Sequence, residues 1–244
     1  MTFLGRLARS FGYDLIPRKK AKALHTQLIA ILKYHRIETV LDVGANVGQY
    51  AERLRDFGYD GKIVSFEPLS SAHAALSERA AGDPAWTIAP RMAIGAEDGD
   101  IDIQVSAETD MSSILPQNAL LKEISPSSEI QSTERVPLRR LDSVAGDFIG
   151  EHDRLILKID VQGFEAEVLE GASALVPKLI GIQLEMSLVP LYKGALDYRS
   201  MVEHMAAHGF ELHLVLPGYF ERKLARQLEI DGVFVKRLQP NEPE

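Results

Sequence analysis

Short apolar runs alternate with amphipathic segments along most of the chain. The apolar runs are bounded by Gly, Pro, Asp or Ser, which is typical of buried strands, whereas the intervening segments repeat apolar residues every three or four positions, which is typical of helices. We predict strands at residues 38–44, 61–68, 86–95, 99–106, 153–163, 179–187, 211–218 and 230–237. We predict helices at residues 23–34, 49–58, 71–81, 139–148, 164–176 and 198–210.

The order of these elements predicts a doubly wound α/β fold. Strands that alternate with helices form a mostly parallel sheet with helices on both faces and right-handed crossovers. The last two predicted strands lack a helix between them, so we expect them to close the sheet as an antiparallel hairpin. Residues 107–136 are rich in Ser, Pro, Gln and Glu, and their composition predicts a loop or lid.

Composition narrows the class of protein. The 244 residues are 45% apolar and 25% charged, which is ordinary for a soluble globular domain. The chain contains no cysteine, so disulfides and thiolate metal sites are excluded. It has no apolar run long enough to span a membrane and no signal-peptide pattern at its beginning, and we therefore expect a cytoplasmic protein.

Charge is unevenly distributed along the chain. Residues 1–36 carry a net charge of +7, which leaves −15 for the remainder of a chain whose total is −8. An acidic body of this size disfavours nucleic acid as a partner because phosphates would be repelled. The basic segment is compatible with peripheral contact with an anionic membrane, or with a solvated helical extension. We divide the chain into a basic helical extension (1–36), a main domain (37–238) and a tail (239–244).

The end of the first predicted strand carries the first candidate site. In open parallel sheets, ligands bind outside the carboxyl ends of the strands. Asp42 ends this strand, and Gly44, Asn46 and Gly48 follow before a helix. The spacing differs from the Gly-x-Gly-x-x-Gly of dinucleotide sites, since Asn46 stands at the middle position. An acid at this turn would oppose a diphosphate, but it suits a ligand with an ammonium or sulfonium group, such as S-adenosylmethionine.

Two further strand ends extend the predicted cofactor site. Glu67 lies 25 residues after Asp42, at the tip of the second strand, where a carboxylate can accept hydrogen bonds from ribose hydroxyls. A dinucleotide site uses the same device, so Glu67 alone does not separate the two. Ala93 lies at the third strand's tip, where a small side chain could face adenine, although a plain turn explains the segment equally well.

The segment "LKIDVQGFE" carries the predicted catalytic residues. Lys158 and Asp160 are two residues apart on one strand and therefore share a face. A lysine inside an apolar strand needs a partner, and Asp160 or Glu165 could serve. Asp160 ends the strand and could accept the proton of a substrate hydroxyl, or orient it. The alternative is a structural ion pair between strand and helix. Glu185 ends the next strand and could face the same cleft.

Weaker signals complete the candidate site. Ser112 and Ser113 lie in the predicted loop and could line the cleft. The seven histidines are scattered and form no His-x-x-x-His pair with an acid, so we predict no metal site.

Six segments together resemble the FkbM-type S-adenosylmethionine-dependent methyltransferases. They are "LDVGANVGQY", "SFEP", "MAIGAEDGDIDI", "RRLDSV", "LKIDVQGFEAEVLEGA" and "IQLEMS", spread over roughly residues 38–237. The first and fifth are the most specific. The resemblance implies a Rossmann-like, seven-stranded class I methyltransferase fold whose last strand is antiparallel. It also implies O-methylation of a hydroxyl on a sugar, glycolipid or polyketide. The residues it assigns to the cofactor site are Asp42, Gly44, Asn46, Gly48 and Glu67, with Asp160 and its neighbours at the methyl-transfer cleft.

Two other functions stay open from the sequence. A nicotinamide-dependent oxidoreductase would share the first two strands and Glu67, but it is disfavoured by Asp42 and by the missing middle glycine. A non-catalytic protein that binds the cofactor, or acts as a scaffold, would keep the same fold. The sequence gives neither the acceptor nor the oligomeric state.

Overall fold

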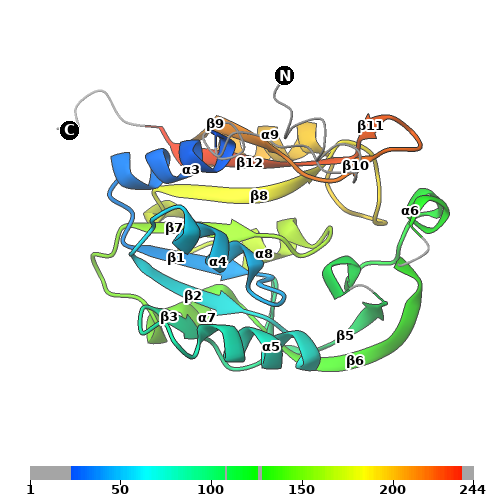
Figure 1. Cartoon of the computed structure of the whole chain (residues 1–244), viewed down its shortest axis with the longest axis horizontal. Helices are drawn as coiled ribbons and strands as arrows, with labels where there is room; N and C mark the ends of the chain where they lie inside the picture. Colours follow the sequence, from blue (N-terminus) through cyan, green and yellow to red (C-terminus); the bar gives the residue numbers. More distant parts are fainter. Residues whose placement is uncertain (1–22, 108, 126–127, 238–244) are drawn as a thin grey trace, which may run out of the picture.

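The computed structural model describes residues 23–107, 109–125 and 128–237, and its centre is a seven-stranded sheet (Figure 1). The strand order is β3-β2-β1-β7-β8-β12-β9. The bounds are β1 Thr39–Val43, β2 Lys62–Phe66, β3 Trp86–Ile88, β7 Leu155–Ile159, β8 Gly181–Ser187, β9 Phe210–Pro217 and β12 Glu229–Lys236. This arrangement confirms the predicted doubly wound α/β class.

Strand direction changes only at the C-terminal end of the chain. Strands β1, β2, β3, β7 and β8 are parallel to one another, as expected for strands joined by helical crossovers. Strand β12 inserts between β8 and β9 and is antiparallel to both. The predicted closing hairpin is therefore present. The central strands β1 and β7 are buried along their whole length, which explains their continuous apolar sequences.

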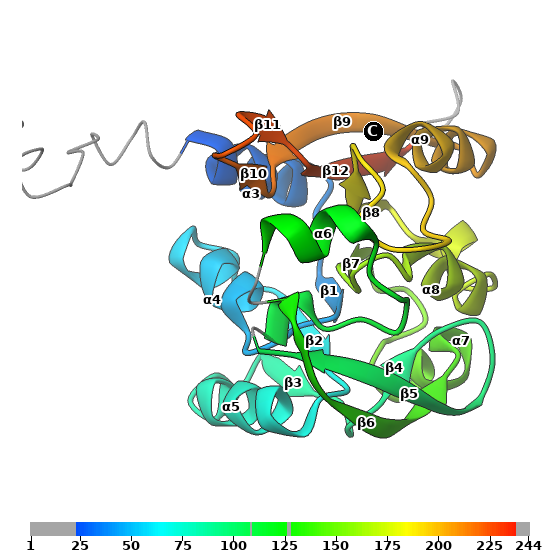
Figure 2. The same ribbon diagram turned by 90° about the vertical axis from the view of Figure 1, so that its right-hand side faces the viewer.

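Helices cover both faces of the sheet (Figure 2). The bounds are α3 Ala23–Tyr34, α4 Gln49–Asp56, α5 Ser70–Ala80, α7 Leu141–Val144, α8 Glu165–Gly171 and α9 Tyr198–Ala207, with 3₁₀ turns at Ala145–Asp147 and Val176–Lys178. Helices α3, α4 and α5 pack one core against the sheet, and α7, α8 and α9 pack a second core against its other face. Each predicted helix is present, although several are shorter than their periodic pattern.

A separate three-stranded sheet, in the order β4-β6-β5, extends from the main body. Its bounds are β4 Ala93–Ile94, β5 Gly99–Ser106 and β6 Ile130–Arg139. The predicted single strand over 86–95 is therefore wrong: β3 joins the main sheet and β4 joins the second one. The prediction of a loop over 107–136 is also wrong in part, because the segment holds a 3₁₀ turn (Thr109–Met111), α6 (Ala119–Ile124) and most of β6. Val136 and Leu138 on β6 pack against Ile103 of β5, which stabilises the strand despite its polar start.

The connection between β9 and β12 contains a small hairpin that the sequence pattern did not predict. Its strands are β10 (Phe220–Glu221) and β11 (Arg226–Gln227), paired antiparallel. At the other end of the chain, α3 belongs to the predicted basic extension and buries Leu28, Ile29 and Leu32 against the sheet. Residues 1–22, and with them most of that extension, lie outside the described part. In the described ranges, the model has no helix long and apolar enough to cross a membrane.

Candidate active site

A cavity of about 300 Å³ opens at the carboxyl ends of β1, β2 and β7. Gly44 and Asn46 after β1, Glu67 after β2 and Asp160 after β7 line it, whereas Gly48 does not. Residues of the second sheet and of α6 form the opposite wall. The cavity therefore lies where ligands bind in open parallel sheets.

The turn after β1 has the backbone conformation that its glycines and asparagine allow. Gly44, Asn46 and Gly48 all have positive φ angles, of 77°, 47° and 95°. Asparagine is among the few residues with a side chain that adopt this conformation readily, so Asn46 can replace a glycine here. A Cβ on Gly44 would lie 1.9 Å from the carbonyl oxygen of Asp160. The β1 turn and the β7 turn therefore touch through their backbones, which requires glycine at position 44.

Glu67 is held at the cavity by two backbone amides. The N–H groups of Asn46 and Leu69 each donate a hydrogen bond of 2.8 Å to its carboxylate, one to each oxygen. Only 4% of the residue is exposed, and burial raises its pKa to about 7, although the two amides act in the opposite direction. Each oxygen keeps capacity for a further hydrogen bond, which is what binding of a diol requires.

Asp42 does not line the cavity, and the contact of its carboxylate with a ligand stays a prediction. The residue is fully buried in β1, and the strand register places Ser65 of β2 and Lys158 of β7 directly beside it. Ser65 donates a hydrogen bond of 3.1 Å to Oδ2, and Nζ of Lys158 lies 3.1 Å from Oδ1 as an ion pair. Oδ2 is therefore hydrogen-bonded, whereas Oδ1 has its ion pair with Lys158 and accepts no hydrogen bond from a described residue.

Lys158 supports the glycine turn and does not line this cavity, although it lines a smaller polar cavity beside it. Its Nζ donates a hydrogen bond of 2.9 Å to the carbonyl of Gly44, and it lies 3.6 Å from the carboxylate of Asp160. Burial acts to lower the pKa of Lys158, but the carboxylates of Asp42 and Asp160 outweigh burial and the net shift is upward. Lys158 is therefore a charged positioning residue, and its place among the catalytic residues stays a prediction.

Asp160 is the predicted catalytic residue that does face the cavity, with 38% of its side chain exposed. Gln162 adjoins it with a left-handed backbone (φ 56°) and donates from Nε2 to Asp160 at 3.1 Å and to Glu185 at 2.9 Å. The hydroxyl of Tyr192 donates to Oε1 of Gln162 at 2.7 Å. All four side chains line the cavity. Gln162 and Tyr192 were not predicted, although the position of Gln162 two residues after Asp160 was a usable signal.

Glu165 lies behind the β7 turn and does not line the cavity. It is the first residue of α8 and is 6% exposed. The backbone N–H groups of Val161 and Gly163 donate to its Oε1 at 3.2 and 3.1 Å. Burial raises its pKa to about 7. Glu165 therefore holds the turn that carries Asp160 and Gln162, and its catalytic role stays a prediction.

Glu229 is a further cavity residue, one that the sequence did not single out. It is the first residue of β12, is 5% exposed, and forms no side-chain hydrogen bond with any described residue. Burial raises its pKa to about 8, and the nearby carboxylates of Asp160 and Glu165 act in the same direction. Glu185 has its pKa raised for the same two reasons. At neutral pH, Glu229 therefore carries a proton for much of the time, and a protonated Glu229 or Glu185 can donate a hydrogen bond.

A smaller polar cavity of about 110 Å³ adjoins the first, and Gln49 and Asp160 line both. It also contains Arg53 of α4 and Asp231 of β12, which have opposite charges. Burial raises the pKa of Asp231 to about 6. The two cavities together form one site, and its smaller part holds both a basic side chain, Arg53, and an acidic one, Asp231.

The remaining wall of the main cavity comes from the second sheet and its loop. Ala93 of β4 lines it, as predicted from the third strand's tip, together with its neighbours Met92 and Ile94. Ser112 and Ser113 also line it, and Ser113 donates from Oγ to the carbonyl of Gln162 at 2.7 Å. The loop wall is therefore tied to the turn that carries Asp160.

Replacing Glu229 by glutamine should flatten the pH dependence of stability. The folded-state pKa of about 8 exceeds the ordinary value of 4.5, so the folded chain keeps a proton that the unfolded chain has lost between these values. The stability linked to this proton is fully present below pH ~4.5 and is lost as the pH rises through ~8. Thermal unfolding midpoints of both proteins at pH 5.5 and 8.5 test this. An equal decrease in the two proteins would contradict the expectation.

The methyltransferase FkbM domain model matches residues 42–212. The 2-O-methyltransferase NoeI of Sinorhizobium fredii (strain NBRC 101917 / NGR234) is 27% identical over 222 residues, covering 86% of each chain. Among solved structures, magnesium protoporphyrin IX methyltransferase (ChlM) from Synechocystis PCC 6803 with bound SAM has a TM-score of 0.45 at 12% identity, covering 96% of this chain and 91% of that one. A putative RNA methyltransferase from Pyrococcus horikoshii has a TM-score of 0.46 at 13% identity, covering 91% and 87%.

The family model spans both turns that build the cavity, from Asp42 through Asp160 to β9. It also spans the second sheet, which forms the other wall. The match therefore covers well over half of the chain and most of the elements that shape the site. The chain belongs to the FkbM methyltransferase family.

Proposed function

We propose that the protein transfers a methyl group from S-adenosylmethionine to a hydroxyl group of a sugar-like acceptor. One observation carries this proposal: Glu67 and Asp160 line a single cavity on either side of a glycine turn. Glu67 suits the ribose of a nucleoside, and Asp160 suits the reacting hydroxyl. Family membership supports methyl transfer, whereas the cofactor and the type of acceptor are our inference.

The residues present fit S-adenosylmethionine. Glu67 has free acceptor capacity for two ribose hydroxyls, and the apolar wall of Leu69, Met92 and Ile94 suits a flat base. In the smaller cavity, Asp231 suits an ammonium group and Arg53 a carboxylate, which are the charges of an amino acid. When bound, the cofactor supplies an electrophilic methyl group on a positively charged sulfur.

Asp160 is the residue best placed to handle the acceptor hydroxyl. Its carboxylate is exposed to the cavity, and Nζ of Lys158 lies 3.6 Å from it. Gln162 and the backbone turn fix its orientation. A carboxylate in this position would accept the proton of the acceptor hydroxyl. Much of the rate enhancement would come from holding the two reactants in line.

The far part of the cavity supports a hydroxyl-rich acceptor. Glu185, Glu229 and Gln162 offer carboxyl and amide groups, and Tyr192 and Tyr219 offer aromatic surface. Such a combination is suited to a sugar ring, which presents several hydroxyl groups beside apolar C–H faces. The name of the 2-O-methyltransferase relative is consistent with this choice.

Replacing Glu67 by alanine should weaken cofactor binding about 10- to 100-fold, because two backbone amides and two ligand hydroxyls lose their acceptor. Calorimetric titration with S-adenosylhomocysteine measures the change. Glu151→Ala, at an exposed position outside the cavity, is the matched control and should bind like the wild type.

Two further assays separate the proposal from its rivals. A titration with NAD should show no binding, and binding of NAD tighter than that of S-adenosylhomocysteine would replace the methyltransferase assignment by an oxidoreductase. Transfer of labelled methyl groups to an oligosaccharide pool tests catalysis. Tight binding of S-adenosylhomocysteine without transfer to any hydroxyl acceptor would favour a non-catalytic, cofactor-binding role.

A further inference from the structure

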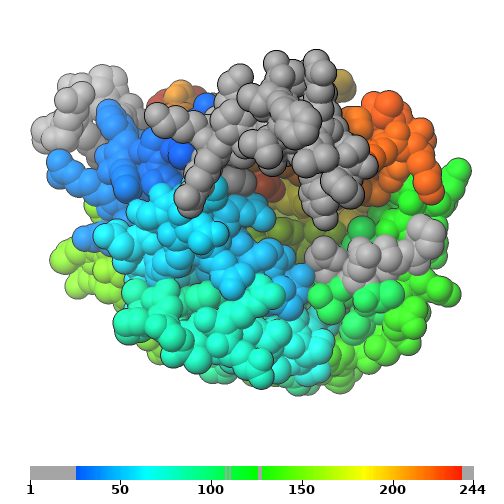
Figure 3. Space-filling view, in the orientation of Figure 1, coloured from blue at the N-terminus to red at the C-terminus, as the bar shows by residue number. Residues whose placement is uncertain are grey.

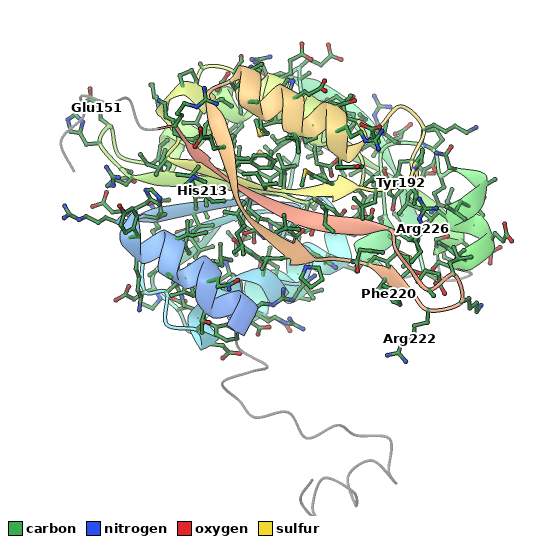
Figure 4. All side chains as sticks on the ribbon, turned by 90° about the horizontal axis from the view of Figure 1, so that it is seen from above. Glu151, Tyr192, His213, Phe220, Arg222 and Arg226 are labelled. Carbon is green, nitrogen blue, oxygen red and sulfur yellow. The ribbon has the colours of Figure 1, made fainter. Side chains whose placement is uncertain are left out.

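The hairpin between β9 and β12 exposes apolar side chains at the surface. We call residues 219–227, which contain β10 and β11, the rim hairpin. Phe220 is 49% exposed and Leu224 is 46% exposed, which is unusual for large apolar residues on a short, protruding element. Figure 4 shows Phe220 near the end of the molecule, with Arg222 extending beyond it. Packing against the described residues leaves this apolar surface exposed.

The rim hairpin is also basic. Arg222, Lys223 and Arg226 are exposed, and none of them forms an ion pair with another described residue. Its single acid, Glu221, is buried and accepts hydrogen bonds of 2.7 Å from the hydroxyl of Tyr219 and from the backbone N–H of Lys223. The hairpin thus carries a net charge of +2, while the rest of the chain carries −10. Its charge is opposite in sign to that of the protein as a whole.

The base of the rim hairpin is fixed to the wall of the active-site cavity. Leu228 is fully buried and packs with Leu121 of α6 and with Tyr192. Its N–H donates a hydrogen bond of 2.8 Å to the carbonyl of Tyr219, which itself lines the cavity. Figure 3 shows the hairpin, in orange, on the outer edge of the molecule. A firmly held base with a projecting tip presents the apolar and basic side chains outward.

Charge and composition limit what can cover this surface. The chain's own first 22 residues contain six Lys or Arg residues and one acid, so the basic hairpin repels them. A free phosphate would bind the cations but would leave Phe220 and Leu224 exposed. An anionic membrane has negatively charged headgroups outside and an apolar interior. The headgroups can bind the basic side chains of the hairpin, and the interior can bury Phe220 and Leu224.

We propose that the rim hairpin docks the protein on an anionic lipid surface, with Phe220 and Leu224 inserted and Arg222, Lys223 and Arg226 at the headgroups. Because the base of the hairpin lines the cavity, docking brings this part of the cavity wall close to the bilayer. This inference stands on surface chemistry and does not depend on the reaction in the cavity.

The absence of cysteine allows a single reporter to be placed at will. Ala225→Cys puts an environment-sensitive fluorophore at the exposed tip without removing an apolar or basic side chain. Glu151→Cys puts it at the opposite end of the molecule (Figure 4). With vesicles of equal parts phosphatidylglycerol and phosphatidylcholine, we expect a blue shift and a gain in intensity at position 225 and no change at 151. Vesicles of phosphatidylcholine alone should give little response.

Two sets of substitutions complete the test. Phe220→Ser with Leu224→Ser should abolish the blue shift, and Arg222→Gln with Arg226→Gln should reduce vesicle binding in sedimentation by about tenfold or more. Sedimentation with no response at position 225 would mean that another part of the chain binds the vesicles, and it would overturn the proposal. A response to a soluble acidic polymer equal to that with vesicles would also overturn it, in favour of an acidic protein partner.

Discussion

Replacing Asp42 by alanine is expected to lower the free energy of unfolding by about 3–5 kcal/mol, since it leaves the buried charge of Lys158 without its partner. Nζ of Lys158 would keep its hydrogen bond to Gly44 but would lose the closer of its two carboxylates. Urea denaturation followed by circular dichroism measures the change. The glycine turn depends on this lysine, so the variant should also bind S-adenosylhomocysteine less tightly.

The double variant Asp42→Ala, Lys158→Met separates the ion pair from packing. Removing both charges should recover most of the lost stability, as is common when a buried pair is replaced by apolar residues. Asp100→Ala is the matched control, because Asp100 forms only an exposed ion pair with Arg135 at 3.9 Å and should change stability by at most ~1 kcal/mol. A single Asp42 variant with wild-type stability that has lost only ligand binding would support the prediction of a direct contact.

Replacing Asp160 by asparagine should lower kcat by about 10²- to 10⁴-fold while S-adenosylhomocysteine binds with nearly unchanged affinity. Asparagine keeps the size of the side chain and an oxygen for the hydrogen bond from Gln162, but it cannot take up a proton. Labelled methyl transfer gives kcat and KM, and calorimetry gives the affinity.

Asp231→Asn is the matched control for Asp160→Asn. Both residues line the smaller cavity, but Asp231 is assigned to the amino-acid end of the cofactor. Its replacement should therefore weaken cofactor binding and affect kcat less. The assignment of Asp160 as the proton acceptor fails if its asparagine variant turns over at the wild-type rate, or if the two variants show the same loss in binding.

Sequence reasoning located the site because strand ends of a parallel sheet meet at one edge. Glu67, Asn46 and Asp160 follow from their positions after predicted strands, and the structure brings them to one cavity. It did not place the side chain of Asp42, because a side chain on a strand can face its neighbours across the sheet. Only the register reveals that Ser65 and Lys158 both lie beside the Asp42 carboxylate. Register is a long-range property that a local pattern does not contain.

Other residues escaped prediction for topological reasons. Glu229 reaches the cavity because β12 inserts between β8 and β9, which brings a late segment of the chain beside Asp160. Tyr192 lies in the connection after β8, where the sequence shows no periodic pattern. The second sheet was likewise hidden, because a two-residue strand such as β4 gives too short a signal.

The backbone contact between Gly44 and the carbonyl of Asp160 has a consequence for how ligands enter. The turns after β1 and β7 touch through their backbones, and Lys158 contacts both of them. They therefore have little conformational freedom to lose when a ligand binds. Because these turns are already ordered without a ligand, ligand binding costs little conformational entropy on this side of the cavity. Changes in acceptor specificity would then occur in the wall formed by the second sheet. The loop between β5 and β6 in that wall can change length without disturbing the central sheet.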